Sequence, residues 1–198
     1  MTQAGSVRPG GRTARTRAAV LEAALDELAE RGWDQVSMET IAARAGVHKT
    51  TLYRRWGGKD RLVAEALEAA AERRIQLPDS GDVDQDLRAL ARAVATVLTS
   101  RDGAATVRAL VAGAQSSPEV GQVVHRFWTT RFAHAGPIVD RAVSRGQLPP
   151  GTDPDELLRY LAAPLFHRLL VTAEPLTPAA ADQAATVVLA AARSGAFT

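Results

Sequence analysis

The chain of 198 residues contains no cysteine. Disulfide bonds and thiolate metal sites are therefore excluded, which fits a reducing compartment. No apolar run approaches the roughly 20 residues that a helix needs to cross a bilayer. The N-terminal region also lacks the apolar segment of a signal peptide. We therefore expect a globular protein of the cytoplasm, and its 46% hydrophobic content is ordinary for that class.

Motifs for catalysis and metal binding are missing as well. The four histidines do not have the spacing of a metal site, and there is no Gly-x-Ser-x-Gly elbow. Residues 57–59, Gly-Gly-Lys, lack the earlier glycine and the following Ser or Thr of a phosphate-binding loop. We therefore expect no enzymatic activity, no cofactor and no metal.

Lysine is scarce, and charge is unevenly distributed along the chain. Lys49 and Lys59 are the only two lysines. Residues 1–60 hold ten basic and seven acidic residues, whereas residues 61–198 hold fourteen basic and fifteen acidic residues. The basic excess therefore lies in the N-terminal third, which favours a nucleic-acid partner for that region.

Residues 1–14 are expected to form a flexible basic arm. Four arginines in or beside this arm have no acidic neighbour: Arg8, Arg12, Arg15 and Arg17. The arm could follow DNA phosphates or enter a minor groove, or it could be a disordered tail that aids solubility. The sequence leaves both interpretations open.

Residues 37–59 have the pattern of two short helices joined by a tight turn. Ser37 can cap the first helix, and Glu39 adds a negative charge at the positive end of the helix dipole. Gly46 suits the left-handed conformation that ends a short helix. A preceding helix over residues 16–31 has an apolar stripe at helical spacing. Three helices around one small core are typical of a DNA-binding module, although such turns also occur as structural corners.

The second helix of this motif starts near His48 and has two different faces. Leu52 and Trp56, four residues apart, are expected to point inward. Polar and basic side chains are expected to point outward: Lys49, Thr50, Tyr53 and Arg54. An exposed basic helix of this kind can enter the major groove of DNA.

Several residues in this stretch carry a resemblance to a known family. They are Thr40-Ile41-Ala42, Ala45-Gly46-Val47, Thr51-Leu52-Tyr53, Trp56 and Lys59. The first third of the chain thus resembles the DNA-binding head of the TetR family of bacterial transcriptional regulators. His48 stands where the family more often has a small capping residue, and Trp56 replaces the more frequent Phe.

The resemblance implies a set of DNA contacts. Thr50, Tyr53 and Arg54 would reach base edges or nearby phosphates. Other residues would fix the register on the backbone: Thr40, His48, Lys49, Thr51 and Lys59. Of these, Lys59 matches the family position that binds a phosphate.

The remaining pattern predicts an all-α protein of about nine helices. It would comprise an N-terminal three-helix helix-turn-helix domain at residues 15–60, a connecting helix at 61–77 and a C-terminal helical bundle at 82–198, which the resemblance makes the ligand-binding and dimerisation domain. Further helices are expected at residues 59–76, 84–99, 103–115, 118–144, 153–172 and 177–193. The helix at 118–144 should kink or split at Gly136-Pro137, because proline lacks the N–H of a helix interior.

The last two helices carry apolar stripes that indicate a partner. In the family such a pair forms a four-helix bundle with a second copy, which would make the protein a homodimer on a palindromic operator. The alternative is that the stripes close the core of one chain. The residues expected at the dimer interface are Leu158, Leu161, Leu165, Val187, Val188 and Ala191.

Aromatic side chains make up only 5% of the chain, and many of them lie in two C-terminal helices. They could line an apolar pocket with a few polar groups, or they could be core or interface residues. The candidate ligand-binding residues are His125, Trp128, Phe132, Tyr160, Phe166 and His167.

These expectations combine into one function. The protein would be a homodimeric repressor, associated with the nucleoid when bound to DNA, and a small molecule would release it from a palindromic operator. Ligand binding would shift the helix at residues 59–76 through the boundary at residues 77–81. The alternatives are a ligand-independent architectural DNA-binding protein and a small-molecule carrier with a vestigial DNA-binding head.

Overall fold

A computed structural model describes residues 10–198, without the side chains of residues 10–12, 71–74 and 116. The described residues form helices and no strand, as the sequence predicts. None of these helices is long and apolar enough to span a membrane. In chain order the elements are α1 (Gly10–Arg31), the 3-10 turn η1 (Trp33–Gln35), α2 (Met38–Ala45), α3 (Lys49–Trp56), α4 (Lys59–Arg74), α5 (Val83–Thr99), α6 (Arg101–Ser116), α7 (Pro118–Ala135), α8 (Pro137–Ser144), α9 (Pro154–His167), the π-helical turn η2 (Arg168–Thr172) and α10 (Pro178–Arg193).

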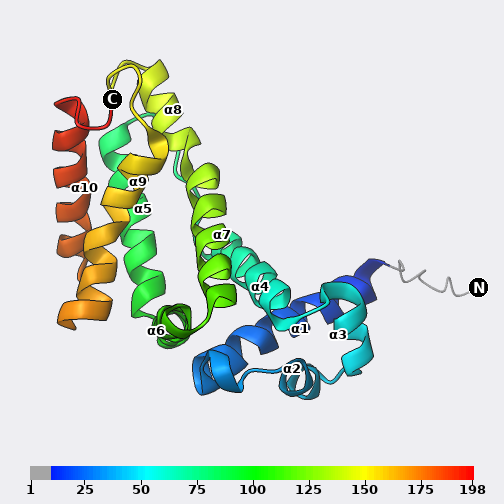
Figure 1. The fold of residues 1–198 in the computed structure, drawn as a ribbon. Coiled ribbons are helices and arrows are strands. Elements are labelled where there is room, and N and C mark those ends of the chain that lie inside the picture. The colour runs from blue at the N-terminus through cyan, green and yellow to red at the C-terminus, as the bar shows by residue number, and fades with distance from the viewer. Residues whose placement is uncertain (1–9) are drawn as a thin grey trace, which may run out of the picture.

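Helices α1–α3 gather at one end of the molecule, and α4 leads from them to the bundle of α5–α10 (Figure 1). We call α1–α4 the head and α5–α10 the body. The head core contains Leu28, Ile41 and Leu52, all fully buried. Helix α1 begins at Gly10, so the arm expected at residues 1–14 overlaps the helix. Residues 1–9, with Arg8, and the side chain of Arg12 lie outside the described part of the chain.

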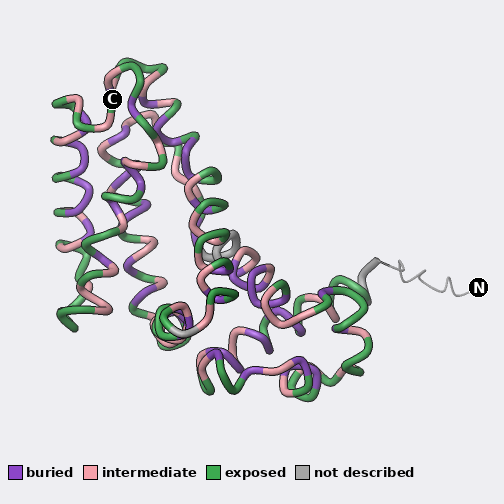
Figure 2. The backbone as a smooth tube through the Cα atoms, viewed as in Figure 1, coloured by how far each residue is buried: buried purple, intermediate pink, exposed green. Residues whose placement is uncertain are grey.

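The body is a layered helical bundle with its own core. Fully buried side chains such as Leu87 and Leu157 lie along its inner faces, and the buried stretches of the tube in Figure 2 face one another between the helices. The predicted break is confirmed, because α7 ends at Ala135 and α8 begins at Pro137. The expected helix at residues 153–172 is divided into α9 and the wider turn η2, four residues after Pro164.

Head and body share a packed junction, in which α1 lies against α6 and α4 lies against α7. The linker between α4 and α5 is also tied down. The backbone N–H of Ser80 donates to buried Asp86 at 2.9 Å, and Arg141 of α8 donates to the carbonyl of Pro78 at 3.1 Å. The expected hinge at residues 77–81 is therefore fastened to the body. The junction of α1 and α4 with α6 and α7 is a direct contact between the head and the body.

Candidate functional site

The helix-turn-helix begins with a reciprocal cap on α2. The hydroxyl of Ser37 accepts from the N–H of Thr40 at 3.1 Å, and the hydroxyl of Thr40 accepts from the N–H of Ser37 at 3.1 Å. Gly46 ends the helix in the left-handed region, with φ of 65°. The predicted cap and stop are confirmed. Thr40, expected to contact DNA, is half-buried and uses its hydroxyl to cap α2.

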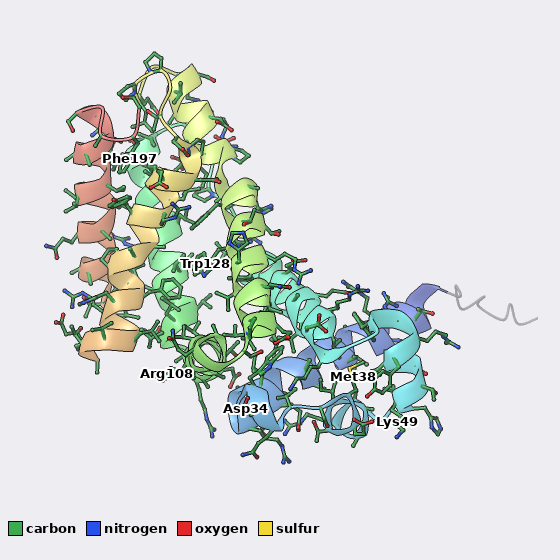
Figure 3. All side chains as sticks on the ribbon, in the orientation of Figure 1. Asp34, Met38, Lys49, Arg108, Trp128 and Phe197 are labelled. Atoms are coloured by element: carbon green, nitrogen blue, oxygen red, sulfur yellow. The ribbon has the colours of Figure 1, made fainter. Side chains whose placement is uncertain are left out.

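Helix α3 has the two faces that the sequence predicts. Leu52 and Trp56 are buried against the head core. His48, at the N-cap, makes no side-chain capping bond and is exposed, and Thr51 is half-buried. The remaining expected contact residues are exposed: Lys49, Thr50, Tyr53 and Arg54. Figure 3 shows Lys49 on the head, remote from the body. The exposed face of α3 is therefore free to approach DNA.

An acidic residue on α2 contacts this exposed face. The carboxylate of Glu39 lies 3.6 Å from the ammonium of Lys49 and accepts from the hydroxyl of Tyr53 at 3.5 Å. All three side chains are exposed, so these contacts are weak. A DNA phosphate would therefore have to compete with Glu39 for Lys49, at little cost.

Glu65 of α4 positions α3 from behind, a role that sequence reasoning missed. Its carboxylate accepts from the indole N–H of Trp56 at 2.7 Å and from Arg17 of α1 at 2.6 Å. A buried indole N–H usually has an acceptor, so Trp56 signalled that one exists. The sequence did not indicate that the acceptor lies on the next helix.

Arg44 fastens α2 to α1. Its Nε donates to Glu27 at 2.7 Å, and its Nη1 donates to Glu30 at 2.9 Å. Glu27 also lies 3.0 Å from Arg31 and is 3% exposed, whereas the side chain of Glu30 is 57% exposed. The hydrogen bond from Arg44 lowers the pKa of Glu30 below its ordinary value. These charge-assisted bonds set the angle of α2, and through the turn that of α3.

Lys59 is held inside the head in this structure. Its ammonium donates to the carbonyl oxygens of Trp33 at 2.9 Å and Val36 at 3.0 Å, and it lies 4.8 Å from the centre of the Trp33 ring. The residue expected to bind a phosphate thus ties the start of α4 to the segment before α2. A phosphate could take only the remaining direction of its N–H groups.

A second site is a cavity of about 200 Å³ in the body, against the head. Trp128, Phe132 and Phe166 line it, and the ring of Trp128 lies 5.4 Å from that of Phe132 and 5.0 Å from that of Phe166. Figure 3 shows Trp128 pointing from α7 into the body. These three candidate ligand-binding residues are therefore brought together at one cavity.

The other three candidate ligand-binding residues lie outside this cavity, which corrects the expectation. His125 and His167 are exposed. Tyr160 is 59% exposed and packs against the ring of Phe197. The aromatic residues are divided between the two sides of their helices, and spacing along the sequence did not reveal which side faces inward.

Comparisons with known proteins agree with this geometry. The family described as "Bacterial regulatory proteins, tetR family" matches residues 20–66. The family described as "Tetracyclin repressor-like, C-terminal domain" matches residues 77–188. The chain belongs to the TetR family.

Relatives of this TetR-family chain are transcriptional regulators. The HTH-type regulator YdeS of Bacillus subtilis (strain 168) is 31% identical over 159 residues, which are 80% of each chain. AqdR of Rhodococcus erythropolis is 35% identical over 142 residues, 72% of this chain and 68% of AqdR. The crystal structure of the TetR family transcription regulator SCO0332 is 32% identical, with a TM-score of 0.75, and the match covers 89% of this chain and 97% of that one. The TetR-family chain is a DNA-binding transcriptional regulator.

Most of the residues expected at the dimer interface do not lie on the outer face of α9 and α10 in this TetR-family chain. Four of the six expected residues are buried in the chain's own core: Leu158, Leu161, Leu165 and Val188. Their side chains point into the chain's own core, and of the four only Val188 also borders the groove on the outer face. Val187 is 62% exposed, and with Ala191 and Tyr160 it lines a groove on the outer face.

Proposed function

We propose that this TetR-family chain is a homodimeric repressor that binds a palindromic operator and is released from it by a small molecule. The exposed polar face of α3, held on the buried pair Leu52 and Trp56, carries the proposal. The cavity against the head is the site proposed for the small molecule.

Base reading is assigned to the exposed face of α3. Arg54 makes no ion pair with the described residues, so its guanidinium is available for the edge of a guanine. Thr50 and Tyr53 are exposed beside it. His48, Lys49 and Thr51 would contact the backbone. Phosphate contacts position the protein, whereas base contacts determine the sequence that it recognises.

Dimerisation is assigned to the outer face of α9 and α10. Val187 and Tyr160 are large, apolar and exposed, and the small side chain of Ala191, one turn after Val187 in the same groove, permits close approach of a second helix. A two-fold dimer presents the same patch twice. It would place two copies of α3 in successive major grooves, roughly 34–36 Å apart or at a multiple of that distance.

Control by a ligand requires that ligand binding and operator binding affect each other. A ligand that weakens operator binding must itself bind less tightly to the DNA complex, by the same factor. The packed junction of α1 and α4 with the body supports such coupling, because a change in the cavity can reach the head through it.

The first experiment is fluorescence anisotropy with the DNA beside the protein's own gene and with scrambled DNA of equal length, at two salt concentrations. We expect a large preference for the natural DNA and two chains bound per site. Equal, strongly salt-dependent binding to all natural and scrambled DNA would instead indicate the architectural function.

A matched pair of variants tests the dimer. Val187→Asp places a charge in the groove, whereas Thr186→Asp places it on the neighbouring exposed residue outside the groove. Sedimentation velocity should give a monomer for Val187→Asp and a dimer for Thr186→Asp. A dimer in both variants would remove this face from the proposal.

A further inference from the structure

The cavity in the body is closed in part by the head. Leu25 of α1 and Leu67 of α4 line it, together with residues of α5, α6, α7 and α9. Its wall therefore crosses the packed junction between head and body. Any molecule that fills the cavity lies against both parts of the chain.

The chemistry of the wall is strongly apolar. Leucine, valine, alanine and aromatic side chains, Trp128 among them, make up most of it. Arg131 is the one charged side chain among the described lining residues, and no described acidic residue lines the cavity. A sugar or a nucleotide would lose many hydrogen bonds with water here without replacing them.

One neutral polar side chain stands out in this apolar wall. Thr106 of α6 is only 7% exposed and lines the cavity, yet its hydroxyl makes no hydrogen bond with the described residues. Other helical threonines of this chain, such as Thr96 and Thr129, donate to the carbonyl four residues before them. The oxygen of Thr106 is not itself fully buried, so it remains accessible from the cavity or from solvent. The hydroxyl of Thr106 is thus available to a bound molecule.

We propose that the cavity binds a largely apolar small molecule with one hydrogen-bonding group, and that this molecule contacts the head directly. Its apolar part packs on Trp128 and its polar group pairs with Thr106. Its contact with Leu25 and Leu67 changes the position of α1 and α4. This inference rests on the proposed ligand-controlled repressor and names the chemistry of its ligand.

Direct contact provides a short path to the DNA-reading helix. Leu67 lies on α4 two residues after Glu65, which holds Trp56 of α3. Leu25 lies on α1, which carries Arg17, the other partner of Glu65. Helices α1 and α4 are joined to each other and to α3 through Glu65. A ligand that moves α1 or α4 away from the body therefore acts on the helices that support α3. The linker at residues 77–81 does not have to move.

The first test uses N-phenyl-1-naphthylamine, an apolar fluorophore that is bright only out of water. We expect saturable binding at one site per chain. Val94→Phe places a ring in the cavity, whereas Thr96→Phe places it on the exposed side of the same helix. Val94→Phe should bind the probe about tenfold more weakly, because the ring occupies its volume, and Thr96→Phe should bind it normally. No saturable binding, or equal binding by both folded variants, would overturn the inference.

The second test uses Thr106→Val, which keeps the shape of the side chain and removes the hydroxyl. Displacement of the fluorophore is measured with naphthalene and with 1-naphthol. We expect the variant to bind 1-naphthol about fivefold more weakly, the loss of one hydrogen bond, and naphthalene as before. Equal changes for the two competitors would contradict the role of Thr106. This test stands even where Val94→Phe does not fold.

Operator binding separates this inference from the proposed function. Wild-type protein saturated with the fluorophore should bind its operator more weakly, and Val94→Phe should respond less at the same concentration. If the free protein has no preferred DNA, the proposed repressor function fails. If it binds its operator and the bound fluorophore leaves the affinity unchanged, direct contact with the head is wrong while the repressor remains.

Discussion

Head and body both have an apolar core, but they differ in the polar contacts that accompany it. In the head, charged hydrogen bonds join the helices: Arg44 to Glu27, Glu65 to Trp56, and Lys59 to the carbonyl of Trp33. In the body, the interior is largely apolar and contains the cavity, and ion pairs such as Arg92 with Asp182 lie on its surface. Hydrogen bonds have preferred directions, whereas apolar contacts do not.

This difference fits the two tasks of the proposed ligand-controlled regulator. A helix that reads bases must keep its angle, because a small rotation would move every base contact proposed for Arg54 and its neighbours. A bundle that binds a ligand gains from contacts that can rearrange, and the cavity leaves side chains such as Trp128 room to do so. The following substitutions compare matched residues, either between the two regions or within the head.

The largest expected effect is loss of a core leucine in the head. Leu52→Ala should lower the free energy of unfolding by about 2–5 kcal/mol, because it removes a fully buried side chain from close-packed surroundings. Leu165→Ala in the body should cost less, because that side chain already borders the cavity and has fewer contacts to lose. Urea denaturation of both variants measures the difference. A larger loss for Leu165→Ala would show that the body is the more tightly packed region.

The next effect concerns the two acids that bind Arg44. Glu27→Ala should lower the free energy of unfolding by about 1.5–3 kcal/mol, since it removes a buried carboxylate that neutralises Arg44 and Arg31. Glu30→Ala should change stability much less, because its carboxylate is exposed and screened by water. Thermal denaturation compares the variants. Similar losses would mean that burial does not strengthen the attachment of α2 to α1.

DNA-binding measurements distinguish residues of the head that read the base sequence from residues that position the protein on the DNA backbone. Arg54→Ala should weaken operator binding by about 1–3 kcal/mol while changing binding to random DNA less. Lys59→Ala should weaken both to a similar degree and should also lower the melting temperature, because the ammonium bridges Trp33 and Val36. Anisotropy and thermal melting are measured on each variant. Equal loss of operator and random DNA by Arg54→Ala would remove it from the base-reading residues.

The smallest effect distinguishes the tryptophans of the two regions. Trp56→Phe should lower the free energy of unfolding by about 1 kcal/mol, because Glu65 loses the indole N–H that binds it. Trp128→Phe, at the cavity, should cost less, because its indole makes no hydrogen bond with the described residues and a Phe ring keeps the apolar contact. Chemical denaturation tests both. An equal cost would show that the bond to Glu65 contributes nothing.

Much of the head could be predicted from sequence because its signals are local. Ser37 caps the helix that begins at the next residue, and Gly46 ends it eight residues later. The four-residue spacing of Leu52 and Trp56 indicates which side of α3 is buried. Each of these features depends on neighbours within one or two turns of helix.

The candidate sites in the body were predicted less well, because a stripe of leucines does not say what it packs against. Leu158, Leu161 and Leu165 were assigned to a partner chain, and they are buried in their own chain. Tyr160 and Phe166 lie on one helix, yet one contacts Phe197 and the other lines the cavity. Only the packing of several helices decides between such positions.

The amino-acid sequence by itself determined the all-α class, the ends of α2, the break before Pro137 and the polar face that α3 presents, because caps, proline and helical spacing act over a few residues. The tertiary structure alone decided that Glu65 binds Trp56, that Lys59 ties two segments of the head together, and that Leu25 and Leu67 close the cavity. These contacts join residues on different helices. Their formation depends on how whole helices pack, which no short stretch of sequence specifies.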